Sequence, residues 1–190
     1  MEQLPKTWRK QLTSVFYALA HGFNTFADYF INHWLGIINI ILGGALFFAI
    51  LTPLLAYAGY EPLAGVMFRS YHLICDQIPS HSYFICGHQI GICARCLAIY
   101  TSLFIFSLGF RKYRAKIPPL DWKVFVLLLL PMALDGGTQL FGWRQSFNEL
   151  RVLTGALFGL GVFWFTLPRV QYAIDETKTA DLALAAQAQA

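Results

Sequence analysis

The sequence predicts an all-α polytopic membrane protein: four transmembrane helices preceded by an N-terminal amphipathic helix at the membrane interface. Of the 190 residues, 57% are hydrophobic and only 13% are charged, about half the ~25% of soluble domains. The mean hydropathy is +0.52. Several segments approach the ~20 apolar residues that a helix needs to cross a bilayer. These observations exclude a disordered chain, a fibrous chain and an ordinary water-soluble domain.

The N-terminal segment, residues 1–34, has the pattern of an amphipathic helix. Its apolar side chains recur at steps of three and four residues, which is the spacing of one helix face. They are Trp8, Leu12, Val15, Phe16, Leu19, Phe23, Phe26, Phe30 and Trp34. A basic start followed by such a stripe favours a helix lying on the inner leaflet. The same stripe would also suit packing against the protein's own bundle or against a partner.

Residues 35–168 are expected to form the four-helix transmembrane domain. The four apolar segments run from about 35 to 58, 89 to 110, 123 to 144 and 150 to 167. The first of them carries no charge, because none occurs between Asp28 and Glu61. The third is framed by Trp122 and Trp143, as interfacial aromatic belts frame a span.

The positive charges are sorted along the chain in a way that sets its orientation. Four spans place both termini on one side, and that side would hold ten of the fourteen Lys and Arg, including all six Lys. The positive-inside rule assigns this side to the cytoplasm. We therefore expect a multi-pass protein of the cytoplasmic (inner) membrane with both termini in the cytoplasm. Its expected partner is the lipid bilayer, and no nucleic acid is expected to bind. Residues 169–190, rich in Ala and Gln, are expected to be a flexible cytoplasmic tail.

An outward loop, residues 59–92, and the start of the second span concentrate the metal-binding residue types. All four cysteines, and three of the five histidines, lie there. His72 and Cys75 form one pair with a two-residue gap, and Cys93 and Cys96 form another. Such a gap lets both side chains of a pair reach one tetrahedral ion, and two pairs at this separation are typical of a zinc knuckle.

The expected ligands are therefore Cys75, Cys93 and Cys96. The residues that compete for the fourth position are His72, Asp76, Cys86 and His88. The mixture of Cys and His favours zinc over an iron–sulfur cluster. A closed four-ligand site would be structural, whereas an open position would permit catalysis.

Three other interpretations of the cysteines remain open. Four cysteines in an oxidising compartment are often two disulfides. A non-catalytic accessory subunit of a larger membrane complex would need nothing more than such bridges. Alternatively, Cys93 and Cys96 stand at a helix start beside Arg95, which favours a reactive thiolate. This arrangement resembles membrane thiol oxidases that pass electrons to quinone, although those carry a second cysteine pair in the second outward loop, where this chain has none.

Asp135 is a charge inside the third span, on its outer side. Intramembrane charges need partners and mark functional sites by default. Arg95 and Arg151 are the expected partners, since each starts a span at the outer side. The other polar residues at this level are Gln139, Arg144, Ser146 and Asn148. The alternative is an Asp–Arg clasp that only fixes the packing of the bundle.

Two blocks of residues resemble a known family. The first block contains Cys75-Asp76-Gln77 and Cys93-Ala94-Arg95-Cys96, and the second contains Asp135-Gly136-Gly137-Thr138-Gln139 followed by Arg144, Ser146, Asn148 and Arg151. In this order they resemble the prokaryotic membrane proteins grouped as domain of unknown function 2085, over about residues 71–161. The resemblance implies a membrane-embedded fold and no particular activity.

This chain also departs from the pattern of that family. The family has Cys-His-Gln where this chain has Cys75-Asp76-Gln77, and Arg where it has His81. Cys86 is an addition to the pattern. If the family's His is a ligand, then Asp76, His81 or Cys86 replaces it here, or the site is lost.

Overall fold

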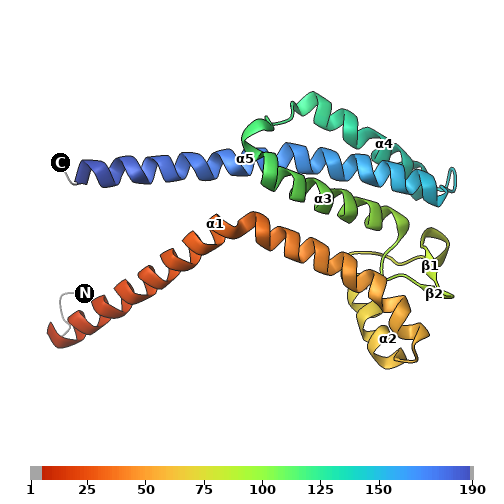
Figure 1. The fold of residues 1–190 in the computed structure, drawn as a ribbon, viewed down its shortest axis with the longest axis horizontal. Helices are drawn as coiled ribbons and strands as arrows, with labels where there is room; N and C mark the ends of the chain where they lie inside the picture. Colours follow the sequence, from red (N-terminus) through yellow and green to blue (C-terminus); the bar gives the residue numbers. More distant parts are fainter. Residues whose placement is uncertain (1–5, 189–190) are drawn as a thin grey trace. The chain divides into compact units, whose positions relative to one another are not determined.

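The computed structural model describes the backbone of residues 6–188 and their side chains except those of residues 6–13, 20, 24, 115, 181, 184, 185 and 188. The chain divides into two compact units, residues 1–37 and 38–190, and each is considered by itself. The described residues are almost entirely helical, as the sequence predicts (Figure 1).

The α-helices are α1 (Lys6–Tyr57), α2 (Glu61–Ser70), α3 (Ala94–Tyr113), α4 (Trp122–Leu140) and α5 (Asn148–Ala188). The connection between α2 and α3 contains the short 3-10 turns η1 (Tyr71–Leu73) and η2 (Pro79–His81) and the antiparallel strands β1 (Phe84–Ile85) and β2 (His88–Gln89). A further 3-10 turn, η3 (Arg114–Lys116), follows α3. In the hairpin Phe84 pairs with Gln89, and Ile85 pairs with His88.

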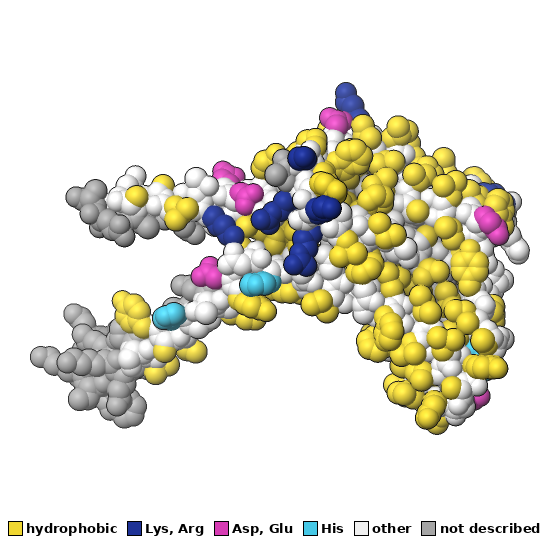
Figure 2. Space-filling view, viewed as in Figure 1, with side chains coloured by type: hydrophobic (Ala, Val, Ile, Leu, Met, Phe, Trp, Pro, Cys, Tyr) yellow, Lys and Arg dark blue, Asp and Glu magenta, His cyan; other side chains and the backbone are white. Residues whose placement is uncertain are grey.

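Four described helices are long and apolar enough to cross a membrane, which confirms the predicted number of spans. The segments concerned are Ser14–Tyr57, Ala94–Tyr113, Trp122–Leu140 and Asn148–Ala180. Most of their side chains are not buried inside the protein. Figure 2 shows hydrophobic side chains spread over the outer face of the unit 38–190. Such a surface requires lipid around it, because water would not solvate it.

The first helix, α1, is continuous where the sequence predicts an interfacial helix followed by a span. Its 52 residues would reach about 78 Å at ~1.5 Å per residue, whereas the hydrocarbon core is only ~30 Å thick. Within the unit 1–37, almost all described side chains from residue 14 to 30 are exposed, Phe16 and Phe23 among them. The side chains of Trp8 and Leu12, which begin the predicted stripe, lie outside the described ones.

Helix α5 packs along both α3 and α4. Its contact with α3 is close, because a Cβ atom on Gly155 would lie 2.7 Å from the carbonyl oxygen of Arg95, and one on Gly159 would lie 2.8 Å from that of Ile99. Small residues let the backbones of membrane helices approach in this way. The first turn of α3, which carries Cys96 and directly follows Cys93, therefore rests directly on α5.

Helix α5 continues through Pro168, although the sequence predicts that the span ends there. Beyond that proline, Arg169 donates to the carbonyl oxygen of Leu120 at 2.8 Å, and its guanidinium lies 3.7 Å from the ring centroid of Phe165. The bond to Leu120 holds α5 against the segment that leads into α4, whereas Phe165 lies one turn earlier on α5 itself. The predicted flexible tail is helical up to Ala188. Lys and Arg side chains gather at the end of the α3–α5 bundle that lies away from β1 and β2 (Figures 1 and 2).

The connection between α2 and α3 is tied to α1 through a proline. Pro53 has no N–H, so the carbonyl four residues earlier, that of Ala49, lacks its helical donor. The N–H of Gly91 donates to this carbonyl at 3.0 Å. A Cβ on Gly91 would lie 3.0 Å from the ring of Tyr71 and 3.1 Å from Cα of Ala49, so a larger residue here would have to push these neighbours away. Pro53 thereby fixes the segment that leads into Cys93.

Candidate metal centre

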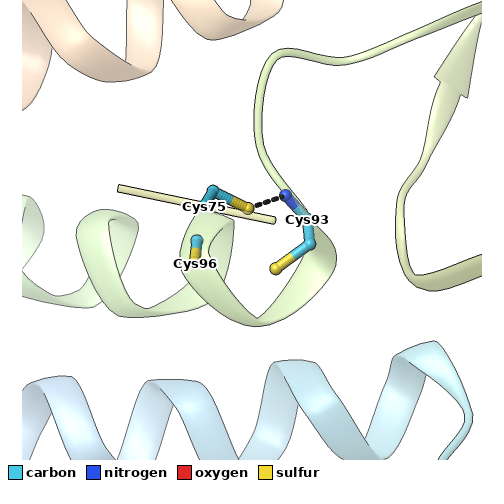
Figure 3. A group of neighbouring side chains, drawn as sticks. All are labelled: Cys75, Cys93 and Cys96. Atoms are coloured by element: carbon cyan, nitrogen blue, oxygen red, sulfur yellow. Dashed lines mark hydrogen bonds between the residues drawn. The ribbon is translucent and has the colours of Figure 1, made fainter. Parts of the chain in front are cut away.

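Three cysteines meet where the connection from α2 joins α3 (Figure 3). Cys75 follows η1, Cys93 is the residue before α3, and Cys96 lies in its first turn. Their Sγ atoms all lie within 4.8 Å of one another. Zn–S bonds of ~2.3 Å in a tetrahedron place sulfur ligands about 3.8 Å apart. The three thiols are therefore close to the separation that one bound ion requires.

The backbone around Cys75 is fixed by two glutamine side chains. Gln77 adopts a left-handed conformation with φ 52°, and its amide NH₂ donates to the carbonyl oxygens of Phe68 at 2.8 Å and Gly91 at 2.6 Å. Gln89 donates in turn to the carbonyl oxygen of Gln77 at 2.7 Å. These bonds join the segment after Cys75 to the segment before Cys93. Sequence reasoning missed these roles, and the only signal for Gln77 was its place in the first family block.

The thiols pack against a buried apolar cluster. It consists of Ala49, Tyr71, Cys75 and Ile92, and both Cys93 and Cys96 pack against it. The backbone N–H of Cys93 donates to Sγ of Cys75 at 3.1 Å. The cluster therefore holds Cys75 against the start of α3, so that a residue 18 positions before Cys93 in the sequence shares its site.

Hydrogen bonds among the three thiols shift the pKa values of Cys93 and Cys75 in opposite directions. The pKa of Cys93 falls well below its ordinary value, because hydrogen bonds from Cys75 and then from Cys96 stabilise its thiolate. The pKa of Cys75 is raised, chiefly through the same hydrogen bond with Cys93. Metals bind the thiolate and not the thiol, so the group favours one deprotonated ligand before an ion arrives.

A cavity of about 350 Å³ lies beside the three thiols and is lined by all of them. The other polar residues that line it are His72, Asp76, Gln77, His81 and Arg95. Burial lowers the pKa of His81, and so do the charges of Arg151 and Arg95, while Cys93 opposes them. His81 therefore lies in the electrostatic field of both the arginines and the thiols.

The residues predicted to compete for the fourth position lie outside the group of three cysteines. Among the described residues, the group of ligand atoms within 4.8 Å contains only the three cysteines. His72 and Asp76 line the same cavity without joining the group, whereas His88 lines a separate cavity with Glu61. Cys86 is exposed at the tip of the β1–β2 hairpin. The hairpin thus carries Cys86 and His88 away from the other cysteines.

The cysteines are not bridged. All four are free thiols, so the structure does not support the predicted disulfides. Three of them face a common centre, and the fourth, Cys86, lies outside the group. This arrangement suits a shared ion better than two separate bonds.

Asp135 of α4 is 2% exposed and binds two guanidinium groups. Its Oδ2 lies 2.5 Å from Arg95 of α3, as the sequence predicts, and its Oδ1 lies 2.7 Å from Arg144. Among the described residues, the expected second partner, Arg151, forms no ion pair with the carboxylate. Arg144 takes this place because it lies in the loop after α4 and can turn back toward Asp135.

Arg151 of α5 is also 2% exposed, and it bonds neutral oxygens. It donates to Oδ1 of Asn148 at 3.1 Å, one turn earlier on the same helix, and to Oε1 of Gln139 at 3.0 Å. Gln139 donates to the backbone oxygen of Asp135 at 2.7 Å, which connects the two sets. Ser146 is buried, and its hydroxyl donates to the backbone oxygen of Phe147 at 3.3 Å. Among the described residues it forms no hydrogen bond with the other predicted polar groups.

Arg95 joins the ion pairs to the thiols. It stands between Cys93 and Cys96 on the first turn of α3, lines the cavity and binds Asp135. The cysteines and the carboxylate of Asp135 are thus linked through one side chain. The first turn of α3 is the element common to both.

Comparison with known proteins identifies the family. The family model described as "Predicted membrane protein (DUF2085)" matches residues 75–165. A protein of Methanocaldococcus jannaschii, named only as uncharacterized, is 39% identical over 127 residues, which cover 62% of this chain and 80% of that protein. A second, from Methanothermobacter thermautotrophicus, is 34% identical over 92 residues, or 48% of this chain and 83% of its own.

No solved structure matches the chain. The matched region begins at Cys75, and it contains Cys93, Cys96 and the ion pairs of Asp135. Together with the four spans, these similarities show that the chain belongs to the DUF2085 family of membrane proteins.

Proposed function

We propose that this membrane protein binds one zinc ion through Cys75, Cys93 and Cys96. The observation that carries the proposal is the convergence of their Sγ atoms within 4.8 Å. Thiolates select zinc or iron–sulfur clusters. Such clusters are held by four protein ligands, usually cysteines, whereas zinc accepts three thiolates and a ligand of another kind. The histidines beside the group also favour zinc.

We further propose that this site faces the outside of the prokaryotic cytoplasmic membrane and that both termini lie in the cytoplasm. The support is the concentration of Lys and Arg at the opposite end of the α3–α5 bundle (Figure 2). Positive residues are retained on the cytoplasmic side during insertion. Under this orientation the metal would enter from the outer aqueous phase.

The zinc proposal is tested by the Cys93→Ser variant. Wild-type protein purified from native membranes without added metal should contain about one zinc per chain. The variant should contain less than about a tenth of that, because a hydroxyl is a far poorer zinc ligand than a thiolate. Metal analysis by mass spectrometry gives the ratio, and bound zinc should also protect Cys93 from alkylation.

Cys86→Ser is the matched control for this experiment, since Cys86 is a free thiol outside the group. It should retain the full zinc content. Equal zinc in Cys93→Ser and wild type would contradict the proposal. Metal-free wild type with a reactive Cys93 would favour thiol–disulfide exchange, and metal-free wild type with unreactive thiols would favour an accessory subunit.

The proposed orientation is tested by labelling Cys86 in intact cells. This thiol is exposed in the hairpin, so a membrane-impermeant maleimide should label it without permeabilisation. A cysteine introduced as Lys178→Cys should react only after the membrane is permeabilised. Cys86→Ser shows the background from the other thiols. The reverse pattern of labelling would place the termini outside.

A further inference from the structure

Among the described residues, only the three thiols converge, so a zinc ion bound by them would have one coordination position without a protein ligand. Zinc is four-coordinate, and sites with three protein ligands keep the fourth position for water or substrate. His72, Asp76 and His81 line the adjoining cavity, yet their ligand atoms are outside the group formed by the cysteines. The cavity, of about 350 Å³, has room for a small molecule next to the thiols.

Arg95 gives this cavity a positively charged wall. Its guanidinium shares the single carboxylate of Asp135 with Arg144, so its charge is only partly compensated. The acidic residue on the cavity wall, Asp76, is exposed, and water screens its charge. Burial lowers the pKa of His81, as do the charges of Arg151 and Arg95, while Cys93 opposes them. The Arg95 guanidinium therefore offers an anion a charged hydrogen-bond donor beside the thiols.

Two buried polar atoms of the cavity residues also lack a hydrogen-bond partner among the described residues. They are Nε of Arg95 and Oε1 of Gln77. The orientation of the Gln77 amide is determined, because its NH₂ group faces two carbonyl oxygens, which can only accept. Gln77 is 4% exposed. An unsatisfied buried polar group is costly. An anion can accept a hydrogen bond from Nε of Arg95, whereas Oε1 of Gln77, a carbonyl oxygen, needs a donor.

We propose that zinc bound by the three cysteines keeps its fourth position open to this cavity and takes there a small anionic ligand that Arg95 stabilises. The inference rests on the proposed function, because the metal supplies the coordination position. Arg95 would donate a hydrogen bond to the anion while Asp135 holds its guanidinium in place. Arg95 is thus a binding residue for the anion and not a metal ligand.

Cobalt substitution tests the two proposals separately. Cobalt(II) in the site should show thiolate-to-metal charge-transfer absorption, which reports the cysteine ligands. Titration with azide should then change the d–d bands, because azide enters the open position. Imidazole, a neutral ligand of similar reach, should bind more weakly than azide, since it gains nothing from Arg95.

Arg95→Gln and Arg144→Gln form the matched pair of variants. Each removes one of the two guanidinium partners of Asp135, but only Arg95 lines the cavity. The Kd for azide should rise about tenfold in Arg95→Gln, which corresponds to the loss of one charge-assisted hydrogen bond. It should change by less than about twofold in Arg144→Gln. If Arg95→Gln does not fold, Arg95→Lys serves as a second variant. It keeps the positive charge and should therefore keep most of the affinity for azide.

Each remaining outcome overturns one of the two proposals. Absence of charge-transfer absorption would overturn the metal site itself. Charge transfer with d–d bands that azide does not change would mean that the fourth position is closed, and a change of those bands in His81→Ala, His72→Ala or Asp76→Ala would identify the residue that closes it. Equal binding of azide and imidazole, or equal effects of the two arginine variants, would overturn the anion preference.

Discussion

Replacing Asp135 with Asn should destabilise the protein by about 3–5 kcal/mol, the range observed when one partner of a buried ion pair is removed. The carboxylate is 2% exposed and bridges Arg95 on α3 to Arg144 after α4. Asn retains the shape but leaves two guanidinium groups without their counter-charge. Reversible unfolding in detergent, followed by circular dichroism against added denaturant, measures the change.

Arg144→Gln is the control for Asp135→Asn. Its side chain is 42% exposed, so its loss should cost no more than ~1 kcal/mol. The double variant Asp135→Asn with Arg95→Gln should lose less stability than the two single variants lose in sum. Removing both members of the pair leaves no unpaired charge at Arg95. Unchanged stability in Asp135→Asn with loss of zinc would instead show that the carboxylate serves the site and not the fold.

Hydropathy and helical spacing were sufficient to predict the fold class and part of the site. Uncharged segments of the right length predict the four spans, because the bilayer imposes both length and composition. The two-residue gap between Cys93 and Cys96 predicts that their side chains share one face of a helix turn. Both features depend only on local geometry, and the structure contains both.

The tertiary details could not be predicted in the same way. Whether Arg144 or Arg151 binds Asp135 depends on how the loop after α4 turns back, which no periodicity reports. The separation of Cys86 and His88 from the other cysteines follows from a hairpin only two residues long on each side. Such short strands leave almost no alternating pattern to recognise.

The C-terminal tail and α1 show a second limit of prediction from the sequence. The low complexity of the Ala-rich residues after Asp175 predicts a flexible segment, yet Ala is the strongest helix former, and α5 extends to Ala188. For α1, no proline separates the amphipathic segment from the span, so one helix continues through both. In both places the helix propensity of the residues explains why the helix continues.

Replacing Gly155 with Ala should weaken both the fold and the metal site. The new Cβ would lie 2.7 Å from the carbonyl oxygen of Arg95 and 3.3 Å from Cβ of Ala98. A backbone oxygen cannot rotate away as a side chain can, so α3 must move relative to α5, at a cost of about 2–3 kcal/mol. Thermal unfolding in detergent and a zinc titration on the same preparation measure the two effects.

Gly109→Ala in α3 is the matched control, because a Cβ there would meet nothing within 4 Å. That change should be neutral or should stabilise the helix by ~0.5–1 kcal/mol. The carbonyl that Gly155 contacts belongs to the turn between Cys93 and Cys96, so moving α3 displaces both of their thiols relative to that of Cys75. If Gly155→Ala lowered stability but left zinc affinity unchanged, the thiols would be positioned by the connection from α2 alone. A loss of both properties would mean that the contact between α3 and α5 determines the geometry of the metal centre as well as the stability of the bundle.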